Sequence, residues 1–288
     1  MFPNPIVHHP FVFDIGPLSL TGFGLAVLLA FLIAQVVSER ELARRGRDVE
    51  AAAVSDVLFG ALLGTLIGGK IYYYAVVTHN PRDLLSRSGF VFWGGFIGSV
   101  IVCTLVIRYK KLVFARFADV AGIAIAAGYA VGRTGCWAVG DDYGKPYSGP
   151  LSVAFPQGSP PSTAAEMQHQ FNVPIPPGTD PASVLSVYPT QLLEVALGMA
   201  MFGILWKLRD HDHAEGWLFG VWCVLAGIER FIVEFFRAKD DRFSFFGGLS
   251  TAQVIAIAIA LIGVVIMYAR ARVGPGRSGI RAVEVATA

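Results

Sequence analysis

The chain is organised around a stretch near its middle that reads Gly132-Arg133-Thr134-Gly135-Cys136-Trp137-Ala138-Val139-Gly140-Asp141-Asp142-Tyr143-Gly144. An apolar run, Val120 to Val131, precedes it and is expected to bring it to the edge of a membrane. An ionisable residue at the end of a hydrophobic helix is costly, so Arg133 is a candidate functional residue whose guanidinium can bind a phosphate bidentately. The alternative is a polar helix end at which Arg133 reaches back to water.

The composition predicts an integral membrane protein. Of the 288 residues, 54% are hydrophobic and 15% are charged, and the apolar residues form runs that approach the ~20 residues needed to cross a bilayer. The net charge of +2 gives no indication of nucleic-acid binding. Cys103, Cys136 and Cys223 are too few and too scattered for a disulfide framework or a zinc site. Because no Lys or Arg precedes Arg40, the first apolar run lacks the basic leader of a cleaved signal peptide and is expected to be retained.

The apolar runs predict an all-α polytopic protein with seven transmembrane helices. The expected spans are about residues 17–37, 54–77, 90–108, 117–135, 189–207, 215–236 and 250–269. Fourteen basic residues then fall on one side and seven on the other, and the richer side should be cytoplasmic. This places the N-terminus outside and the C-terminus inside. We expect one membrane domain over residues 1–273 and a mobile cytoplasmic tail over 274–288.

A Pro-rich connection, residues 145–189, is expected on the outer face. It holds ten of the sixteen prolines. A loop of this length in a compact protein is more often a lid or binding element than filler, and a disordered spacer is the alternative. The embedded Val153-Ala154-Phe155-Pro156 favours an ordered segment.

Small residues recur at helical spacing within the expected spans. Gly60, Gly64 and Gly68 lie four residues apart, which lets transmembrane helices approach closely, so helix packing is the better interpretation of this group. Gly94 and Gly95 lie near the expected outer face, where they can additionally open a path for a ligand.

Charged residues gather at the outer end of the sixth expected span. Arg230, Glu234 and Arg237 share a helix face, and Asp240 follows them. Glu234 can hold one arginine in place while another remains free for an anion. Together with Arg133 this predicts three guanidinium groups at one membrane depth, where the obvious anion is a phospholipid headgroup. The alternative is a structural ion-pair network, particularly between Arg230 and Glu234.

Asp141 and Asp142 are the remaining candidates for chemistry. One of them can act as a base or orient an arginine, although Asp-Asp-Tyr-Gly is also typical of a simple turn. Cys136 has no histidine nearby in sequence to activate it, so a small packed thiol is favoured over a nucleophile. The spacing of the histidines suggests no metal site.

These motifs together resemble those of the prolipoprotein diacylglyceryl transferases of bacterial inner membranes. The resemblance rests on Ile15-Gly16-Pro17-Leu18, Trp93-Gly94-Gly95, the Gly132–Gly144 stretch, Tyr188-Pro189-Thr190-Gln191-Leu192-Leu193-Glu194, and Arg230-Phe231-Ile232-Val233-Glu234-Phe235-Phe236-Arg237 with Asp240 and Gln253. The motifs cover most of the chain in the order of the family, and the outside-to-inside topology of seven spans agrees.

The resemblance implies transfer of a diacylglyceryl group from phosphatidylglycerol to the lipobox cysteine thiol of a preprolipoprotein, without a metal or organic cofactor. It implies a bacterial cytoplasmic (inner) membrane location with the site on the outer side. Arg133 and Arg237 would stabilise the departing phosphate, and Asp141, where the family usually has Glu, would orient them or receive the thiol proton. The expected substrate-binding residues are Arg133, Gly132, Cys136, Gly140, Gly144, Trp93, Gly94, Gly95, Phe23, Gln191, Arg230 and Glu234. Among them, Gly140 and Gly144 would leave room for headgroup and peptide.

The chain departs from the family pattern at four positions. Phe23 stands at a usual Tyr, Trp93 at a usual His, Cys136 at a usual Asn and Tyr188 at a usual His. If an imidazole is the general base in relatives, this chain needs another route, such as one of the paired aspartates. Two alternatives therefore stay open: a divergent paralogue that uses another acceptor, and a non-catalytic phospholipid-binding membrane protein.

Overall fold

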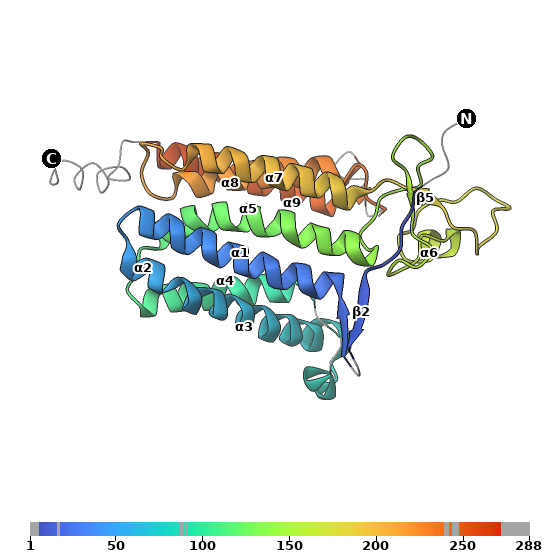
Figure 1. The fold of residues 1–288 in the computed structure, drawn as a ribbon, viewed down its shortest axis with the longest axis horizontal. Coiled ribbons are helices and arrows are strands. Elements are labelled where there is room, and N and C mark those ends of the chain that lie inside the picture. The colour runs from blue at the N-terminus through green and yellow to red at the C-terminus, as the bar shows by residue number, and fades with distance from the viewer. Residues whose placement is uncertain are drawn as a thin grey trace. The chain divides into compact units, whose positions relative to one another are not determined.

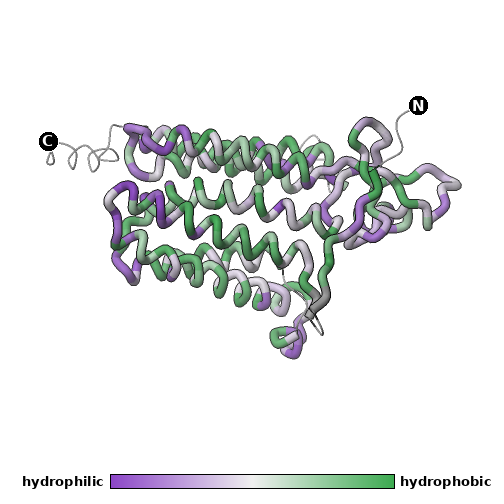
Figure 2. Tube along the Cα trace, viewed as in Figure 1, coloured by the Kyte–Doolittle hydropathy of each residue, from purple (hydrophilic) through white to green (hydrophobic). Residues whose placement is uncertain are grey.

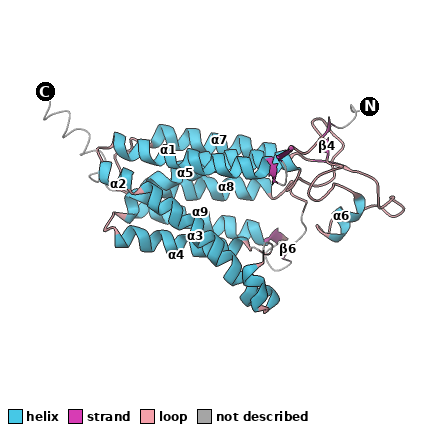
Figure 3. Cartoon of the chain, turned by 60° about the horizontal axis from the view of Figure 1, so that its bottom comes forward, coloured by secondary structure: helices cyan, strands magenta, loops and turns pink. Residues whose placement is uncertain are grey.

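The computed structural model describes residues 6–15, 18–86, 89, 91–238, 242–243 and 248–271. Within these ranges most of the chain is helical and the strands are short (Figures 1 and 3). The elements are β1 (Ile6–Val7), β2 (Val12–Ile15), β3 (Leu18–Thr21), α1 (Gly22–Arg44), α2 (Asp48–Ala52), α3 (Val54–Tyr72), the π-helix η1 (Tyr73–Thr78), the 3₁₀-helix η2 (Pro81–Leu85), α4 (Phe92–Tyr109), α5 (Phe114–Val139), β4 (Val153–Ala154), α6 (Ala164–His169), β5 (Ser186–Val187), α7 (Thr190–Leu208), α8 (Trp217–Val233), β6 (Arg242–Phe243), β7 (Leu249–Ser250) and α9 (Thr251–Ala269).

Six helical segments of the described chain are long and apolar enough to cross a membrane. They are α1, the continuous stretch Asp48–Thr78, α4, α5, α7 and α9. Figure 2 shows these helices as hydrophobic over most of their length, with hydrophilic residues concentrated at helix ends and in connections. This confirms an all-α polytopic membrane protein. The helix expected over residues 215–236 is present as α8, but its 17 residues make it shorter than the other six, so the count of seven spans stays a prediction.

The first helix lies later in the chain than the sequence predicted. Residues Leu18–Thr21 form β3, which pairs antiparallel with β2. The helix begins at Gly22 and continues to Arg44, beyond the expected end near residue 37. This extension is stable because Glu41, which is buried, forms ion pairs of 2.8 Å with both Arg44 and Arg45 about one turn away.

The chain divides into two compact units. One unit comprises residues up to Ala34 together with those from Gly122 to Gly276, and the other contains residues 35–121. This division does not test the predicted domain over residues 1–273, which stays a prediction. The expected tail over 274–288 lies outside the described residues.

Close glycine contacts join α3 and α4 in the second unit. A Cβ at Gly64 would overlap the Gly98 carbonyl, and one at Gly68 would lie 2.9 Å from the Gly98 Cα. A Cβ at Gly94 would in turn meet Tyr72 and the Gly68 carbonyl. The predicted packing role of the glycines in α3 is therefore confirmed, and the same geometry extends to Gly94.

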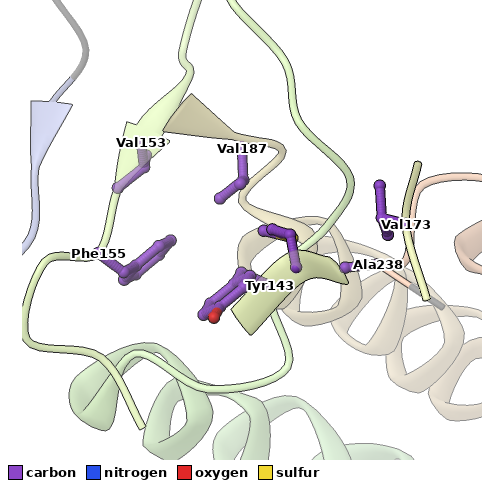
Figure 4. Packing of buried hydrophobic residues seen from close by; sticks show 7 residues of the cluster. Tyr143, Val153, Phe155, Val173, Val187 and Ala238 are labelled. Carbon is purple, nitrogen blue, oxygen red and sulfur yellow. The ribbon is translucent and has the colours of Figure 1, made fainter. Parts of the chain in front are cut away.

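The connection over residues 145–189 is folded and contributes most of a hydrophobic cluster in the first unit. Strand β4 pairs with both β1 and β5, and α6 follows. The Phe155 and Tyr143 rings stack 5.2 Å apart (Figure 4). The cluster comprises Tyr143, Val153, Phe155, Met167, Val173, Val187 and Ala238. Ala238 lies shortly after α8, so the cluster joins the Pro-rich connection to the chain that carries Arg237.

Replacement of Gly64 by Ala should destabilise the protein, because the new methyl group would enter the space of the Gly98 backbone. Overpacking of this kind costs about 1–3 kcal/mol. The matched control is Gly203→Ala in α7, where a Cβ meets nothing within 4 Å and helix propensity favours Ala. Thermal unfolding in mild detergent would compare the two variants. An equal Tm would contradict the importance of the close α3–α4 approach.

Candidate active site

Helix α5 carries Arg133 and continues further than the sequence predicted. The expected span ended near residue 135, whereas α5 ends at Val139, so the first eight of the thirteen residues of the Gly132–Gly144 stretch are helical. The helix stops at Gly140, whose φ of +69° is readily available to glycine. Asp142 also has a positive φ, +53°, a conformation that Asp tolerates better than most residues. The two left-handed positions turn the chain sharply, back toward the end of α5.

The start of α7 fixes this turn from the other side. The Thr190 hydroxyl donates to the backbone carbonyl of Asp142 at 2.7 Å, and the Gln191 amide donates to that of Asp141 at 2.5 Å. Both Thr190 and Gln191 are buried. The backbone of the two aspartates is therefore held in place, and their side chains are left to interact with other groups.

Asp142 bridges two arginines that lie about a hundred residues apart in the chain. Arg133 Nη1 donates to Asp142 Oδ2 at 2.7 Å, and Arg237 Nη2 donates to Asp142 Oδ1 at 3.0 Å. Each carboxylate oxygen thus binds a different guanidinium. An isolated bridge of Gly144 with Arg237 brings the chain after α8 alongside the turn. The sequence prediction that Arg133 and Arg237 lie close together agrees with this geometry.

A second carboxylate, Glu194 of α7, faces the same two arginines. Glu194 Oε1 lies 2.9 Å from Arg133 Nη2 and 3.9 Å from Arg237 Nη1. Its side chain is 0% exposed, and neither oxygen has a well-aligned hydrogen bond within the described chain. An unpaired carboxylate at such a position would be very unfavourable, so Glu194 depends on the charge of the arginines.

Tyr129 supports Arg133 from one turn earlier in α5. Its ring lies 5.3 Å from the Arg133 guanidinium carbon, within the range of a cation–π interaction. Its hydroxyl donates to Glu229 of α8 at 2.8 Å. The guanidinium is therefore held by a ring face and by two carboxylates, which fixes its orientation.

Arg230 is arranged differently from the other two arginines. Its Nη2 lies 2.6 Å from Glu234 Oε2, whereas Arg237 Nε is 3.9 Å from the same oxygen. Arg133 and Arg237 thus share Asp142 and Glu194, while Arg230 forms a local pair with the buried Glu234 one turn away. The alternative of a structural pair for Arg230 and Glu234 fits this geometry, and Asp240 lies outside the described residues.

Asp141 has a different environment from Asp142 although the two are adjacent. Burial, and next the charge of Asp142, raise the pKa of Asp141 to about 6. Burial would also raise the pKa of Asp142, but Arg237 and Arg133 outweigh that effect and hold its pKa below the ordinary value. Asp141 can therefore accept a proton near neutral pH, whereas Asp142 stays ionised as a counter-ion.

Cys136 lies beside the two aspartates. Its Sγ and one oxygen from each carboxylate lie within 4.8 Å of one another, a grouping that can by geometry hold a metal ion. However, Arg133 Nη1 lies 3.5 Å from the sulfur and 2.7 Å from the Asp142 oxygen, so a cationic group already occupies this position. Cys136 is buried, as expected for a packed thiol. The predicted lack of a metal stays a prediction.

The predicted glycines of the stretch differ in their surroundings. A Cβ at Gly132 would meet nothing within 4 Å. At Gly140 it would lie 2.9 Å from Phe155, and at Gly144 it would lie 2.7 Å from the Tyr188 Cβ. A side chain at either position would therefore meet protein atoms, so both glycines are needed for the packing of the turn. Any direct contact of these glycines with substrate stays a prediction.

The remaining predicted residues lie on α1, α4 and α7. Phe23 is half-exposed on α1, and its Cα lies 3.1 Å from a Cβ built at Gly135 of α5. Gln191 holds the turn, as described above. Trp93, Gly94 and Gly95 lie at the start of α4 in the second unit, where Trp93 packs against the Phe92 ring 5.6 Å away. The contribution of these five residues to substrate binding stays a prediction.

Sequence reasoning did not select Glu194, Tyr129 or Glu229 as site residues. Glu194 and Glu229 are carboxylates within apolar runs, and the rule that singled out Arg230 applies to them equally. Glu194 also lies in the quoted motif that begins at Tyr188. Tyr129 had no such signal, because one tyrosine in an apolar helix is ordinary.

The fold and the site define a polytopic membrane protein with a half-buried pair of arginines suited to an anionic ligand. Residues 10–269 match the family described as prolipoprotein diacylglyceryl transferase, and the chain belongs to this family. A phosphatidylglycerol–prolipoprotein diacylglyceryl transferase of Xanthomonas oryzae pv. oryzae (strain PXO99A) is 31% identical over 269 residues, which is 90% of each chain. A protein of the same name from Xanthomonas euvesicatoria pv. vesicatoria is 30% identical over 96% of this chain and 97% of the relative. Another from Geobacter sulfurreducens is 28% identical over 92% of this chain and 97% of the relative.

Replacement of Glu194 by Gln should lower stability strongly, because it leaves buried guanidinium charge with less compensation. Breaking a buried ion pair costs on the order of 3–5 kcal/mol. The control is Asp56→Asn, which removes the 2.6 Å ion pair between Asp56 and Lys110. The Asp56 side chain is 55% exposed and that of Lys110 is 36% exposed. An exposed pair contributes about 0–1 kcal/mol. Comparable small shifts in Tm for the two variants would show that Glu194 is not a required counter-ion.

Proposed function

We propose that this protein transfers the diacylglyceryl group of phosphatidylglycerol to the lipobox cysteine thiol of a preprolipoprotein. The products are a thioether-linked lipid and glycerol phosphate. The observation that carries the proposal is the convergence of Arg133 and Arg237 on one pair of carboxylates, in a chain of this family. Two guanidinium groups oriented in this way can bind a phosphate and stabilise the charge that develops on it.

The transfer is a nucleophilic substitution at a glyceryl carbon. The peptide thiol loses its proton, the sulfur forms a bond to that carbon, and the bond between the carbon and a phosphate oxygen breaks with its electron pair leaving on the oxygen. Arg133 and Arg237 stabilise the phosphate as it leaves. Asp141 receives the thiol proton, since its pKa of about 6 suits a base near neutral pH. In this way an aspartate replaces the imidazole that the resemblance leads one to expect at Trp93 or Tyr188.

The other predicted residues shape the site in this proposal. Gly132 offers open space beside Arg133, and Cys136 occupies the position of the family's usual Asn. Arg230 and Glu234 form the pair that borders Arg237. The remaining residues proposed to contact substrate are Gly140, Gly144, Trp93, Gly94, Gly95, Phe23 and Gln191. No cofactor takes part in the proposed reaction.

The protein is a multi-pass bacterial membrane protein, and we assign it to the cytoplasmic (inner) membrane. In this assignment α8 is a seventh span, the N-terminus lies outside and the C-terminus lies in the cytoplasm. The unequal division of basic residues supports that orientation. The site then faces the outer side, where a preprolipoprotein signal peptide presents its lipobox.

Two other functions account for parts of the observations. A divergent paralogue with another acceptor would keep the arginine pair and explain the substitutions at Phe23, Trp93 and Cys136. A non-catalytic phospholipid-binding protein would need the arginines but not Asp141. Both are tested by the experiments below.

Purified protein with phosphatidylglycerol and a synthetic lipobox peptide should produce a diacylglyceryl adduct on the peptide cysteine, detected by mass spectrometry. Arg133→Ala should reduce kcat/KM by about 100-fold or more, because one of two charged donors to the phosphate is lost. Arg116→Ala is a matched control, since Arg116 pairs with Glu50 in the other unit. If the protein binds phosphatidylglycerol but forms no adduct on the peptide, the two alternative functions are favoured. Full activity of Arg133→Ala would exclude a role of Arg133 at the phosphate.

The transfer rate should depend on the ionisation of Asp141. A base must be deprotonated, so kcat should be low below the pKa of about 6 and rise to a plateau above it. Asp141→Asn should lower kcat by about 100-fold, remove this rise and leave the binding of phosphatidylglycerol nearly unchanged. Rates measured between about pH 5 and pH 8 would test this. If kcat of Asp141→Asn rises with pH in the same way as that of the wild type, the titrating group is not Asp141.

A further inference from the structure

The arginine pair is already neutralised by the protein itself. Arg133 and Arg237 carry two positive charges, and Asp142 and Glu194, which pair with both of them, carry two negative charges. Arg230 and Glu234 add one further charge of each sign, and Glu234 also lies 3.9 Å from Arg237. An anionic headgroup added to this arrangement would give an excess of negative charge in a poorly hydrated site. Binding is therefore favoured if one carboxylate gives up its place.

The two carboxylates differ in their freedom to do so. The Glu194 side chain is 0% exposed, whereas that of Asp142 is 38% exposed and those of both arginines are 17% exposed. Asp142 is thus the outermost member of the group, and a ligand approaching the arginines from solvent or lipid meets it first. Glu194 remains behind them as a fixed counter-charge.

Only the side chain of Asp142 needs to move. Its backbone carbonyl is held by Thr190, the neighbouring carbonyl is held by Gln191, and the turn is packed through Tyr143 into the hydrophobic cluster. Rotation about the Cα–Cβ bond would withdraw the carboxylate without opening the turn. The exchange therefore requires no rearrangement of the fold.

We propose that Asp142 occupies the phosphate subsite in the lipid-free protein and that the phosphodiester of the lipid replaces it between Arg133 and Arg237. A carboxylate and a phosphodiester are both singly charged and both offer two oxygens to two donors, so the exchange preserves the charge of the site. This inference rests on the proposed function, since it takes the lipid phosphate as the ligand of the two arginines.

The same exchange favours release of the product. Breaking the bond to the glyceryl carbon converts the phosphodiester to a monoester, which carries about −1.5 to −2 charges at neutral pH. Asp142 then competes for the arginines with the same charge as before, while the more negative product is repelled by both aspartates. Asp142 therefore selects a singly charged phosphodiester and helps expel the phosphate that remains after transfer.

The test measures binding to protein in phosphatidylcholine nanodiscs, so that it does not depend on transfer. Asp142→Gly removes the competing carboxylate and suits the positive φ of 53°, and Asp142→Asn removes only the charge. Both variants should bind phosphatidylglycerol about tenfold more tightly than wild type, and they should also bind glycerol phosphate more tightly. Asp180→Asn is the matched control, with an expected change of less than about twofold, because the Asp180 side chain is exposed and accepts a hydrogen bond from the Ala182 amide.

The outcomes separate the possibilities. Unchanged or weaker binding of phosphatidylglycerol by either folded variant would overturn the exchange and make Asp142 a structural counter-ion. A gain restricted to soluble glycerol phosphate would overturn it for the lipid. If the wild-type protein transfers nothing but both variants bind the lipid more tightly, the exchange is supported. In that case only the proposed function is contradicted.

Discussion

Two guanidinium groups at the end of an apolar helix bundle need negative charge nearby, and this need organises the site. Arg133 comes from α5 and Arg237 from the chain after α8, while Glu194 comes from α7 and Asp142 from the turn after α5. Each carboxylate faces both arginines, so loss of any one member leaves a charge without its partner. Electrostatic compensation therefore links three distant parts of the sequence at one point.

The folded connection over residues 145–189 makes that compensation possible by fixing the backbone around it. Tyr143 packs against Phe155 immediately after the paired aspartates, and Ala238 enters the same cluster immediately after Arg237. The two chain segments that supply ionic partners are thus anchored to one hydrophobic core a residue away from their charges. Apolar burial, which lacks direction, brings the two chain segments close together, and the ion pairs fix the orientation of their charged side chains.

The apolar runs were sufficient to predict a polytopic helical protein, because membrane spans have a length fixed by the bilayer. The boundaries were harder to predict: α1 begins at Gly22 since residues 18–21 pair with β2, and α5 continues to Val139 since nothing before Gly140 breaks it. Arg133 and Arg237 were found as charges beside apolar runs. Glu194 was not selected, although it too is a charge within an apolar run. Its pairing with the two arginines becomes visible only after helices separated by many residues have packed.

The division of labour between Asp141 and Asp142 could not be read from the sequence, where the two are equivalent neighbours. The turn separates them: Asp142, at a positive φ, presents both oxygens to the arginines, whereas Asp141 remains beside Cys136 with one buried oxygen lacking a partner in the described chain. Because both arginines pair with Asp142, that side chain stays ionised. Its negative charge in turn helps to raise the pKa of Asp141. In the proposed mechanism this pair of identical side chains supplies one counter-ion and one base, which would let a site lacking the expected imidazoles move a proton.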